Sequence, residues 1–209
     1  MITTDNTKRF ELLHTERLLL RRPTVQDANA IFSTCKQKDV TKYLLFPPHN
    51  SIQDALNFIQ WSDEKWEKKV GYHFIVCSKA DDGRVIGGVG LSVERLDDGS
   101  KESEKYPVVV ARIGYCIAKQ QWGKGYATET CKKMIELAVE VGITKLVAPV
   151  HPDNLASIRV LEKCGFQEDA MTSETMVLFP NLGKEKSTLV GFVRSLSLSD
   201  PPPTLTWED

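Results

Sequence analysis

The stretch from Ile113 to Phe166 restricts the fold most, because strand and helix patterns alternate in it around a glycine loop. A β-rich run, 113–117, precedes the loop Trp122-Gly123-Lys124-Gly125, and a long amphipathic run follows. A second apolar run and a second capped helix close the stretch at Gly165. Two glycines at a helix start leave backbone N–H groups uncovered, where the helix dipole favours an anion. The pattern therefore predicts a phosphate-binding loop.

Two better-known glycine motifs do not fit this loop. A Walker loop needs a glycine five residues before the Gly-Lys pair and Ser or Thr after it, but these positions hold Ala118 and Gly125. A dinucleotide fingerprint needs G-x-G-x-x-G directly after a strand. This motif ends in Thr128, and residues 118–122 separate it from the strand. For the glycines alone, a turn with a purely structural role stays open.

The composition indicates an ordinary globular protein of 209 residues, 41% hydrophobic and 26% charged. A net charge of −1 argues against a nucleic-acid or membrane partner. No apolar run approaches the ~20 residues of a membrane span, and the first residues lack a signal-peptide pattern. Five scattered cysteines fit reduced thiols, and four scattered histidines do not suggest zinc. We therefore expect a cytoplasmic protein without a metal.

The remaining chain predicts one α/β or α+β domain. Capping boxes begin helices at Thr24 and Ser51. Strand patterns cover 16–22, 72–78, 85–93, 107–117, 144–150, 166–179 and 188–196, and further helices cover about 125–141, ending at Gly142, and 154–163. Three glycines within 87–90 predict a bulge or a close approach. We expect an N-terminal lead-in at 1–15, a domain at 16–196 and a mobile proline-rich tail at 197–209.

Several spaced motifs together resemble the GNAT acetyltransferase superfamily over about residues 12–196. The acyl-CoA loop, Q/R-x-x-G-x-G/A, falls on 122–127, and Ile113-Gly114-Tyr115 is similar to the strand that binds the pantetheine arm. Segments 154–157 and 162–166 are similar to the family's N-x-x-S and E-K-x-G-F motifs, and 15–21 to its opening strand. Within this superfamily, the chain resembles the Rim-type group, which includes ribosomal-protein-alanine N-acetyltransferases.

The resemblance implies a single α+β domain with a mixed, mostly antiparallel sheet of about six or seven strands and about four helices. It implies acetyl transfer from acetyl-CoA, the cosubstrate, to a primary amine by direct attack in a ternary complex. The residues that it implies for acetyl-CoA binding are Tyr115, Cys116, Ile117, Trp122, Gly123, Lys124, Gly125, Tyr126, Ala127, Thr128, Asn154 and Ser157. For Lys124, a solvated surface position is an equal alternative.

The catalytic residues that the resemblance implies are Asn154 and Ser157. Asn154 would order the pantetheine arm, although a helix cap alone also explains it. The family's usual acid is a tyrosine four residues after Ser157, where this chain has Leu161. Ser157 would therefore donate a proton to the departing thiolate, a modest task because a free thiol has a pKa of ~8.5.

The general base stays open. Rim-type relatives often have Glu directly before I-G-Y, and this chain has Arg112 there. Arg112 either binds a carboxylate on the acceptor, since its planar fork matches one, or is a surface or ion-paired residue. The fallback candidates for the general base are Glu94, Glu102 and Glu104. We expect packing roles for Cys116 and Cys164, and a turn at 151–153.

The acceptor also stays open among a protein N-terminus, a polyamine, an amino acid and another small amine. The protein is expected to be a monomer or a homodimer. The alternative function is a non-catalytic acyl-CoA-binding or sensing module that kept the loop and lost turnover.

Overall fold

The computed structural model describes residues 10–96, 108–182 and 186–196. Nine strands form its sheet system, in the order β1-β2-β3-β4-β5-β6-β9-β7, with β8 on β9. They are β1 (Leu12–His14), β2 (Leu18–Arg21), β3 (Gly71–Ser78), β4 (Arg84–Leu96), β5 (Val108–Ile117), β6 (Lys145–Val150), β7 (Gln167–Glu168), β8 (Glu174–Leu178) and β9 (Lys186–Ser195). Every described pair is antiparallel except β5–β6, which is parallel.

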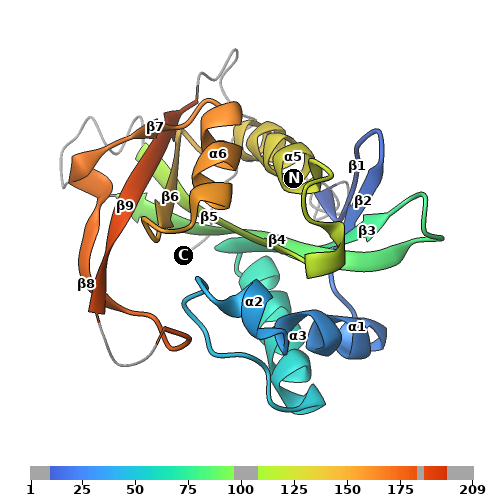
Figure 1. Ribbon diagram of the computed structural model, residues 1–209. Coiled ribbons are helices and arrows are strands. Elements are labelled where there is room, and N and C mark those ends of the chain that lie inside the picture. The colour runs from blue at the N-terminus through green and yellow to red at the C-terminus, as the bar shows by residue number, and fades with distance from the viewer. Residues whose placement is uncertain (1–9, 97–107, 183–185, 197–209) are drawn as a thin grey trace.

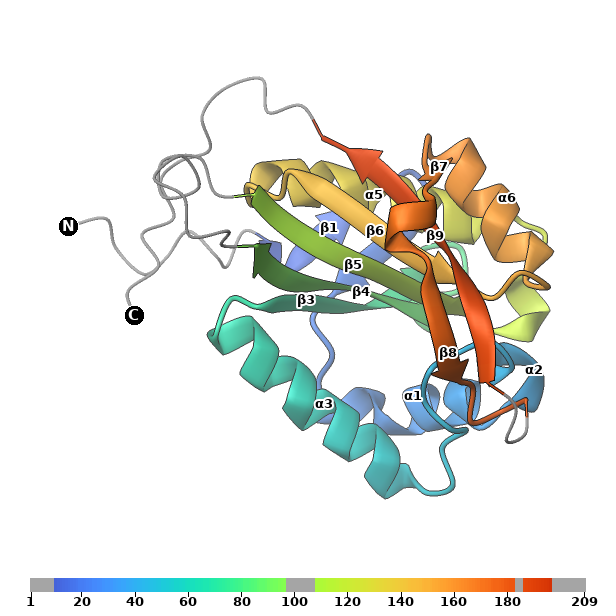
Figure 2. The same ribbon diagram turned by 90° about the vertical axis from the view of Figure 1, so that its left-hand side faces the viewer.

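Helices cover both faces of the sheet (Figure 1). One face packs against α5 (Tyr126–Glu140) and α6 (Leu155–Lys163), and the other against α1 (Ala28–Cys35), α2 (Lys38–Thr41) and α3 (Ile52–Glu67). The turned view in Figure 2 separates these two helical layers. Because both faces are covered, all eight residues of β3 are buried. The larger buried cluster lies under α5 and α6, and a smaller one joins α1 and α3 to β3.

The helix boundaries follow local signals in the sequence. Ser51 precedes α3, and its backbone N–H donates to the Asp54 carboxylate over 2.9 Å. Thr24 makes the equivalent bond to Asp27 over 2.8 Å before the turn that leads into α1. Gly142 follows α5 with φ of +80°, a left-handed conformation that favours glycine. The predicted starts at Thr24 and Ser51 and the stop at Gly142 are therefore confirmed.

The glycines of β4 have two structural causes. The β3–β4 register passes from Val76–Gly87 to Cys77–Val85, which leaves Ile86 as the extra residue of a bulge. A Cβ at Gly87 would lie 2.2 Å from the Cys116 carbonyl oxygen of β5. The predicted bulge and the predicted close approach both occur.

Three details differ from the sequence predictions. The predicted strand at 166–179 is broken between β7 and β8, because the Asp169 carboxylate accepts the Met171 N–H over 2.9 Å and turns the chain. Part of the expected lead-in forms β1, and Phe10 before it is buried. The short strands β1, β7 and β8 raise the strand number above six or seven, although the α+β class with a mixed, mostly antiparallel sheet is confirmed. The predicted tail lies outside the described residues.

Candidate active site

The two parallel strands of the sheet separate part-way along their length. Pairing of β5 with β6 starts at Val110–Lys145 and ends at Arg112–Val147. Beyond this point both strands continue, to Ile117 and Val150, without pairing with each other, and the structure describes all of these residues. An open backbone edge on β5 results.

The open edge presents the backbone of Tyr115 and Ile117. The Ala118 N–H donates to the Ile86 carbonyl of β4 over 2.8 Å. Because backbone groups alternate in direction along a strand, those of residues 117 and 115 point away from β4, into the opening. The Ile117 carbonyl already accepts a hydrogen bond of 2.6 Å from the Trp122 indole N–H. The N–H and C=O of Tyr115 are therefore the groups on this edge best placed to pair with an extended ligand.

The glycine loop lies beside this opening, at the start of α5. Gly123 and Gly125 have φ of +76° and +81°, and Gly125 is the N-terminal cap of the helix. A Cβ on Gly123 would meet nothing within 4 Å, so the space over the loop is open. The first N–H groups of α5 have no partner within the helix and lie at its positive end. This geometry fits a pyrophosphate, which needs close backbone approach and N–H donors.

Residues directly before β2 make hydrogen bonds that fix the glycine loop and the first turn of α5. The Arg17 guanidinium donates to the Glu129 carboxylate over 2.7 Å and to the Lys124 carbonyl over 2.9 Å. Glu129 also accepts bonds from the Thr15 hydroxyl and the Arg17 backbone N–H, at 2.5 and 2.9 Å. Although partial burial opposes it, these donors lower the pKa of the Glu129 carboxyl below its ordinary value. Lys124 itself is exposed and bonds to Gln121.

The start of α6 places Asn154 and Ser157 on the other side of the opening. The Asn154 side chain accepts the Ser157 N–H over 3.3 Å, so Asn154 does cap its helix. The Ser157 hydroxyl lies 2.9 Å from the Tyr115 hydroxyl. Leu161, the position of the family's usual tyrosine, is fully buried in the core. Burial raises the pKa of Tyr115, which keeps its hydroxyl protonated and able to donate.

A cavity of about 820 Å³ lies on the opposite face of the sheet, toward α1–α3. Arg112, Gly114 and Cys116 of β5 line its floor beside the opening. Cys35 of α1 also lines the cavity, and its thiol lies beside that of Cys116. Its wall and rim are mainly apolar and aromatic: Tyr43, Leu44, Leu45, Phe46, Pro47, Pro48, Phe58 and Trp61.

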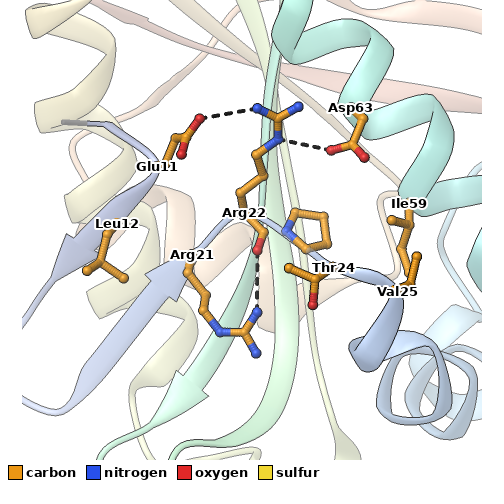
Figure 3. A pocket seen from close by; sticks show the side chains of 9 residues that line it. Glu11, Leu12, Arg21, Arg22, Thr24, Val25, Ile59 and Asp63 are labelled. Carbon is orange, nitrogen blue, oxygen red and sulfur yellow. Dashed lines mark hydrogen bonds and ion pairs between the residues drawn. The ribbon is translucent and has the colours of Figure 1, made fainter. Parts of the chain in front are cut away.

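A second hollow, of about 550 Å³, shares no lining residue with this cavity. Figure 3 shows Arg22 in it, directed at Glu11 and Asp63, with ion pairs of 3.2 and 2.9 Å. Glu67 pairs with the same guanidinium at 2.8 Å. Each charged side chain that lines this hollow takes part in an ion pair, and these pairs join Arg22, directly after β2, to α3.

The family model described as an acetyltransferase (GNAT) domain matches residues 17–167. The chain belongs to the GNAT acetyltransferase family. The uncharacterized N-acetyltransferase YoaA of Bacillus subtilis is 32% identical over 80% of this chain and 89% of its own. The structure of RimL, a ribosomal L7/L12 alpha-N-protein acetyltransferase in complex with coenzyme A, is 16% identical and superposes with a TM-score of 0.73, covering 90% of this chain and 99% of that one. A spermidine N-acetyltransferase from Vibrio cholerae, in complex with CoA and spermine, is 18% identical with a TM-score of 0.67, covering 87% and 96%.

The GNAT resemblance and the acyltransferase class are thus confirmed, and the alternative of a non-catalytic module is not favoured. No described helix is long and apolar enough to cross a bilayer. Within the described ranges, no three or more His, Cys, Asp or Glu side chains form a metal-binding group.

The fold gathers the residues predicted from sequence around one opening. Tyr115, Ile117, the loop at 122–128 and the pair Asn154 and Ser157 border it on one face, and Arg112 and Cys116 line the cavity on the other. Cys164 is buried in the core, and His151 lies in a turn where its ring accepts the Asp153 N–H. Glu94 belongs to β4, pairing with Val110, whereas Glu102 and Glu104 lie outside the described residues.

Two features of the site went unpredicted. One is the Tyr115 hydroxyl beside Ser157. The other is His73, a buried residue of β3 that lines the cavity. The alternation of β5 could have indicated the direction of Tyr115. No local signal marks His73, because its neighbours come from other strands and from α3.

Proposed function

We propose that this GNAT protein transfers the acetyl group of acetyl-CoA to a primary amine by direct attack in a ternary complex. One observation supports this most: the β5–β6 opening adjoins the glycine loop and Ser157 on one face and a large cavity on the other. A thioester held in the opening would face an amine entering from the cavity. Direct transfer requires such contact between two separately bound substrates.

Acetyl-CoA fits the groups around the opening. The N–H groups at the start of α5 and the open space over Gly123 would hold the pyrophosphate. The backbone of Tyr115 would pair with pantetheine amides, as an added strand pairs with a sheet edge. Asn154, whose side chain fixes the first turn of α6, would order the same arm.

In this mechanism, Ser157 donates the proton that the departing CoA thiolate takes up. The Tyr115 hydroxyl, 2.9 Å away, orients the Ser157 hydroxyl or relays a proton to it from solvent, and the amine nitrogen gives up its own proton to solvent as the amide forms. The attacking amine must be neutral, and an α-amine with a pKa of ~8 meets this condition more often at pH 7 than a lysine amine with a pKa of ~10.4.

Arg112 is proposed to contact the acceptor, since it lines the cavity one residue from Ile113-Gly114. Its guanidinium would favour acceptors that bear a carboxylate. Replacement of Arg112 by Glu should then shift preference from amino acids toward amines without a carboxylate. An unchanged preference would remove this role.

The proposed acceptor is either a protein N-terminus, as in the Rim-type group, or a small amine. RimL is described as acting on a ribosomal protein and the Vibrio enzyme as acting on spermidine, so one fold serves both classes. The test is CoA thiol release with a broad amine panel, followed by mass spectrometry of acetylated products from a cell extract. Tight acetyl-CoA binding without thiol release for any amine would instead support a sensing module.

A further inference from the structure

His73 of β3 begins a row of three residues that crosses the sheet to the β5–β6 opening. It pairs with Gly90 of β4, and Gly90 pairs with Gly114 of β5. Adjacent strands lie ~4.8 Å apart, so the backbone of Gly114 lies about 10 Å from that of His73. All three residues line the cavity. Pairing of β5 with β6 ends two positions before Gly114, at Arg112.

The two glycines keep this row clear of side chains. A Cβ at Gly90 would lie 2.3 Å from Cδ2 of His73, so the imidazole already occupies the space over β4. A Cβ at Gly114 would meet nothing within 4 Å. The imidazole therefore lies next to the open space over Gly114 of β5, beside the proposed position of the thioester.

The imidazole has a buried nitrogen without a partner. His73 is 7% exposed, and no described residue hydrogen-bonds to its Nδ1. A buried polar atom left unpaired is rare and costs free energy. Of the two ring nitrogens, Nε2, which adjoins Cδ2, is the one that faces Gly90, so Nε2 is the atom that a ligand along this row would reach.

Aromatic side chains from α3 surround the imidazole. The ring centroid of Trp61 lies 4.4 Å from that of His73, and the Phe58 ring meets the imidazole edge-on at 6.3 Å. Phe46 and Trp61 are each 41% exposed, and Leu45 52%, so the rim presents apolar surface to an entering molecule. These side chains favour an apolar body next to the group that His73 would bind.

The cavity is poorly suited to a polyamine. Asp54 is the one carboxylate among the described residues that line it. That carboxylate already accepts the N–H groups of Asn50 and Ser51 at 2.8 and 2.9 Å, at the start of α3. A chain of several ammonium groups needs several carboxylates, since each buried cation needs its own partner.

We propose that the imidazole of His73 accepts a hydrogen bond from the acceptor amine, while Phe58 and Trp61 hold an aromatic or other apolar body attached to it. The acceptor would then be a small primary amine with an apolar body, and a carboxylate on such an amine would meet Arg112, which lines the same cavity. This inference rests on the proposed function, and it makes His73 a residue that touches the substrate.

The protonation state of His73 suits hydrogen bonding rather than proton removal. Burial, with a smaller effect of Lys65, lowers the pKa of the imidazole to about 4. It is therefore neutral at pH 7, keeps a lone pair for the amine and does not repel an ammonium ion. Its pKa lies far below that of an alkylammonium, so it is a weak base for that group.

The first test is equilibrium binding to the CoA-saturated protein. Tryptamine and 2-phenylethylamine should bind, and both spermidine and ethylbenzene, which has no hydrogen-bond donor, should bind at least about fivefold more weakly, since loss of one hydrogen bond or of apolar contact is worth about 1 kcal/mol or more. Equal or tighter binding of spermidine would overturn the apolar-body assignment. Equal binding of ethylbenzene would overturn the role of the amine.

Variants test the role of His73 itself. His73→Phe keeps a ring and removes the acceptor atom, and the KM for 2-phenylethylamine should rise about tenfold while the acetyl-CoA Kd stays unchanged. His73→Asn should restore part of the loss, since its amide oxygen can accept the bond. If His73 only packs, His73→Phe lowers stability and leaves the KM unchanged.

Gly114→Ala offers a second variant if His73→Phe fails to fold. The added methyl group enters open space, so stability should hold while amine binding weakens. Unchanged amine binding in this variant would contradict an acceptor position along the row.

Separate results identify which proposal fails. Thiol release with spermidine or with a peptide N-terminus, while aromatic amines neither bind nor react, would overturn this inference and leave the acetyltransferase function standing. Binding of aromatic amines without thiol release for any amine would support this inference and overturn the proposed function.

Discussion

The hydroxyl groups of Tyr115 and Ser157 lie 2.9 Å apart, although 42 positions separate the two residues in the chain. Tyr115 comes from the strand that leaves its parallel neighbour, and Ser157 from the first turn of α6. The pair therefore forms where the sheet opens. A proton donor at this place would lie near the sulfur of the thioester that we propose to bind in the opening.

Ser157→Ala should lower kcat by about 10²-fold, at the low end of the range for general acid catalysis, because a thiolate is a good leaving group. Tyr115→Phe should lower kcat less, since only its hydroxyl is lost, and the backbone that would bind pantetheine is kept. Steady-state kinetics with acetyl-CoA binding by calorimetry would measure both. The exposed Ser195 of β9 gives the control, Ser195→Ala. Equal turnover for Ser157→Ala and the wild type would contradict an acid role.

The glycine loop permits a matched pair of substitutions. Gly123 and Gly83 have nearly the same φ, +76° and +75°, and a Cβ on either meets nothing within 4 Å. Alanine at either position should therefore reduce the free energy of unfolding by about 1 kcal/mol. Only Gly123→Ala should also weaken acetyl-CoA binding, because Gly83 lies in the β3–β4 turn. Equal acetyl-CoA affinity in the two variants would contradict a pyrophosphate site over Gly123.

Arg17→Leu should raise the Kd for acetyl-CoA about fivefold, which is equivalent to about 1 kcal/mol. The reason is that the loop loses the hydrogen bonds that Arg17, directly before β2, makes to the Lys124 carbonyl and to Glu129. The free energy of unfolding should fall by less than about 1 kcal/mol, since the Arg17 side chain is 44% exposed and water screens the ion pair. Arg84→Leu, at an exposed position of β4, is the control. Wild-type affinity for acetyl-CoA in both variants would contradict this role of Arg17.

His73 should make stability depend on pH between about 6.5 and 4. Its folded-state pKa of about 4 lies below the ordinary value of 6.5, so in this range the unfolded chain binds a proton that the folded protein does not. The contribution of the neutral imidazole to the free energy of unfolding is fully present above pH 6.5. It is lost as the pH falls toward 4, by up to about 3 kcal/mol.

Urea unfolding from pH 4.5 to 7.5 would compare the wild type with His73→Phe, which has no titrating group at this position. The wild type should lose more stability on acidification. The half-buried His49, whose pKa burial also lowers, is present in both proteins and cancels in the comparison. Parallel pH profiles would show that His73 titrates normally.

The sequence alone determined the local parts of this protein. Residues at fixed short spacings produce them: Ser51 with Asp54 starts α3, Gly142 ends α5, and Gly123 with Gly125 opens a helix at the loop. The GNAT resemblance also rested on short motifs, among them 122–127 and 154–157, so it too was available without a structure.

Tertiary structure decided what meets across the sheet. Where β5 leaves β6, which face the Tyr115 hydroxyl occupies, and the row of His73, Gly90 and Gly114 all depend on strand register. Register depends on the turns and on which strand faces pack into the core, so the pattern of one strand alone does not specify which residues it meets across the sheet. The loop proposed to bind acetyl-CoA is therefore a property of its own sequence, whereas the pocket proposed for the acceptor exists only in the assembled fold.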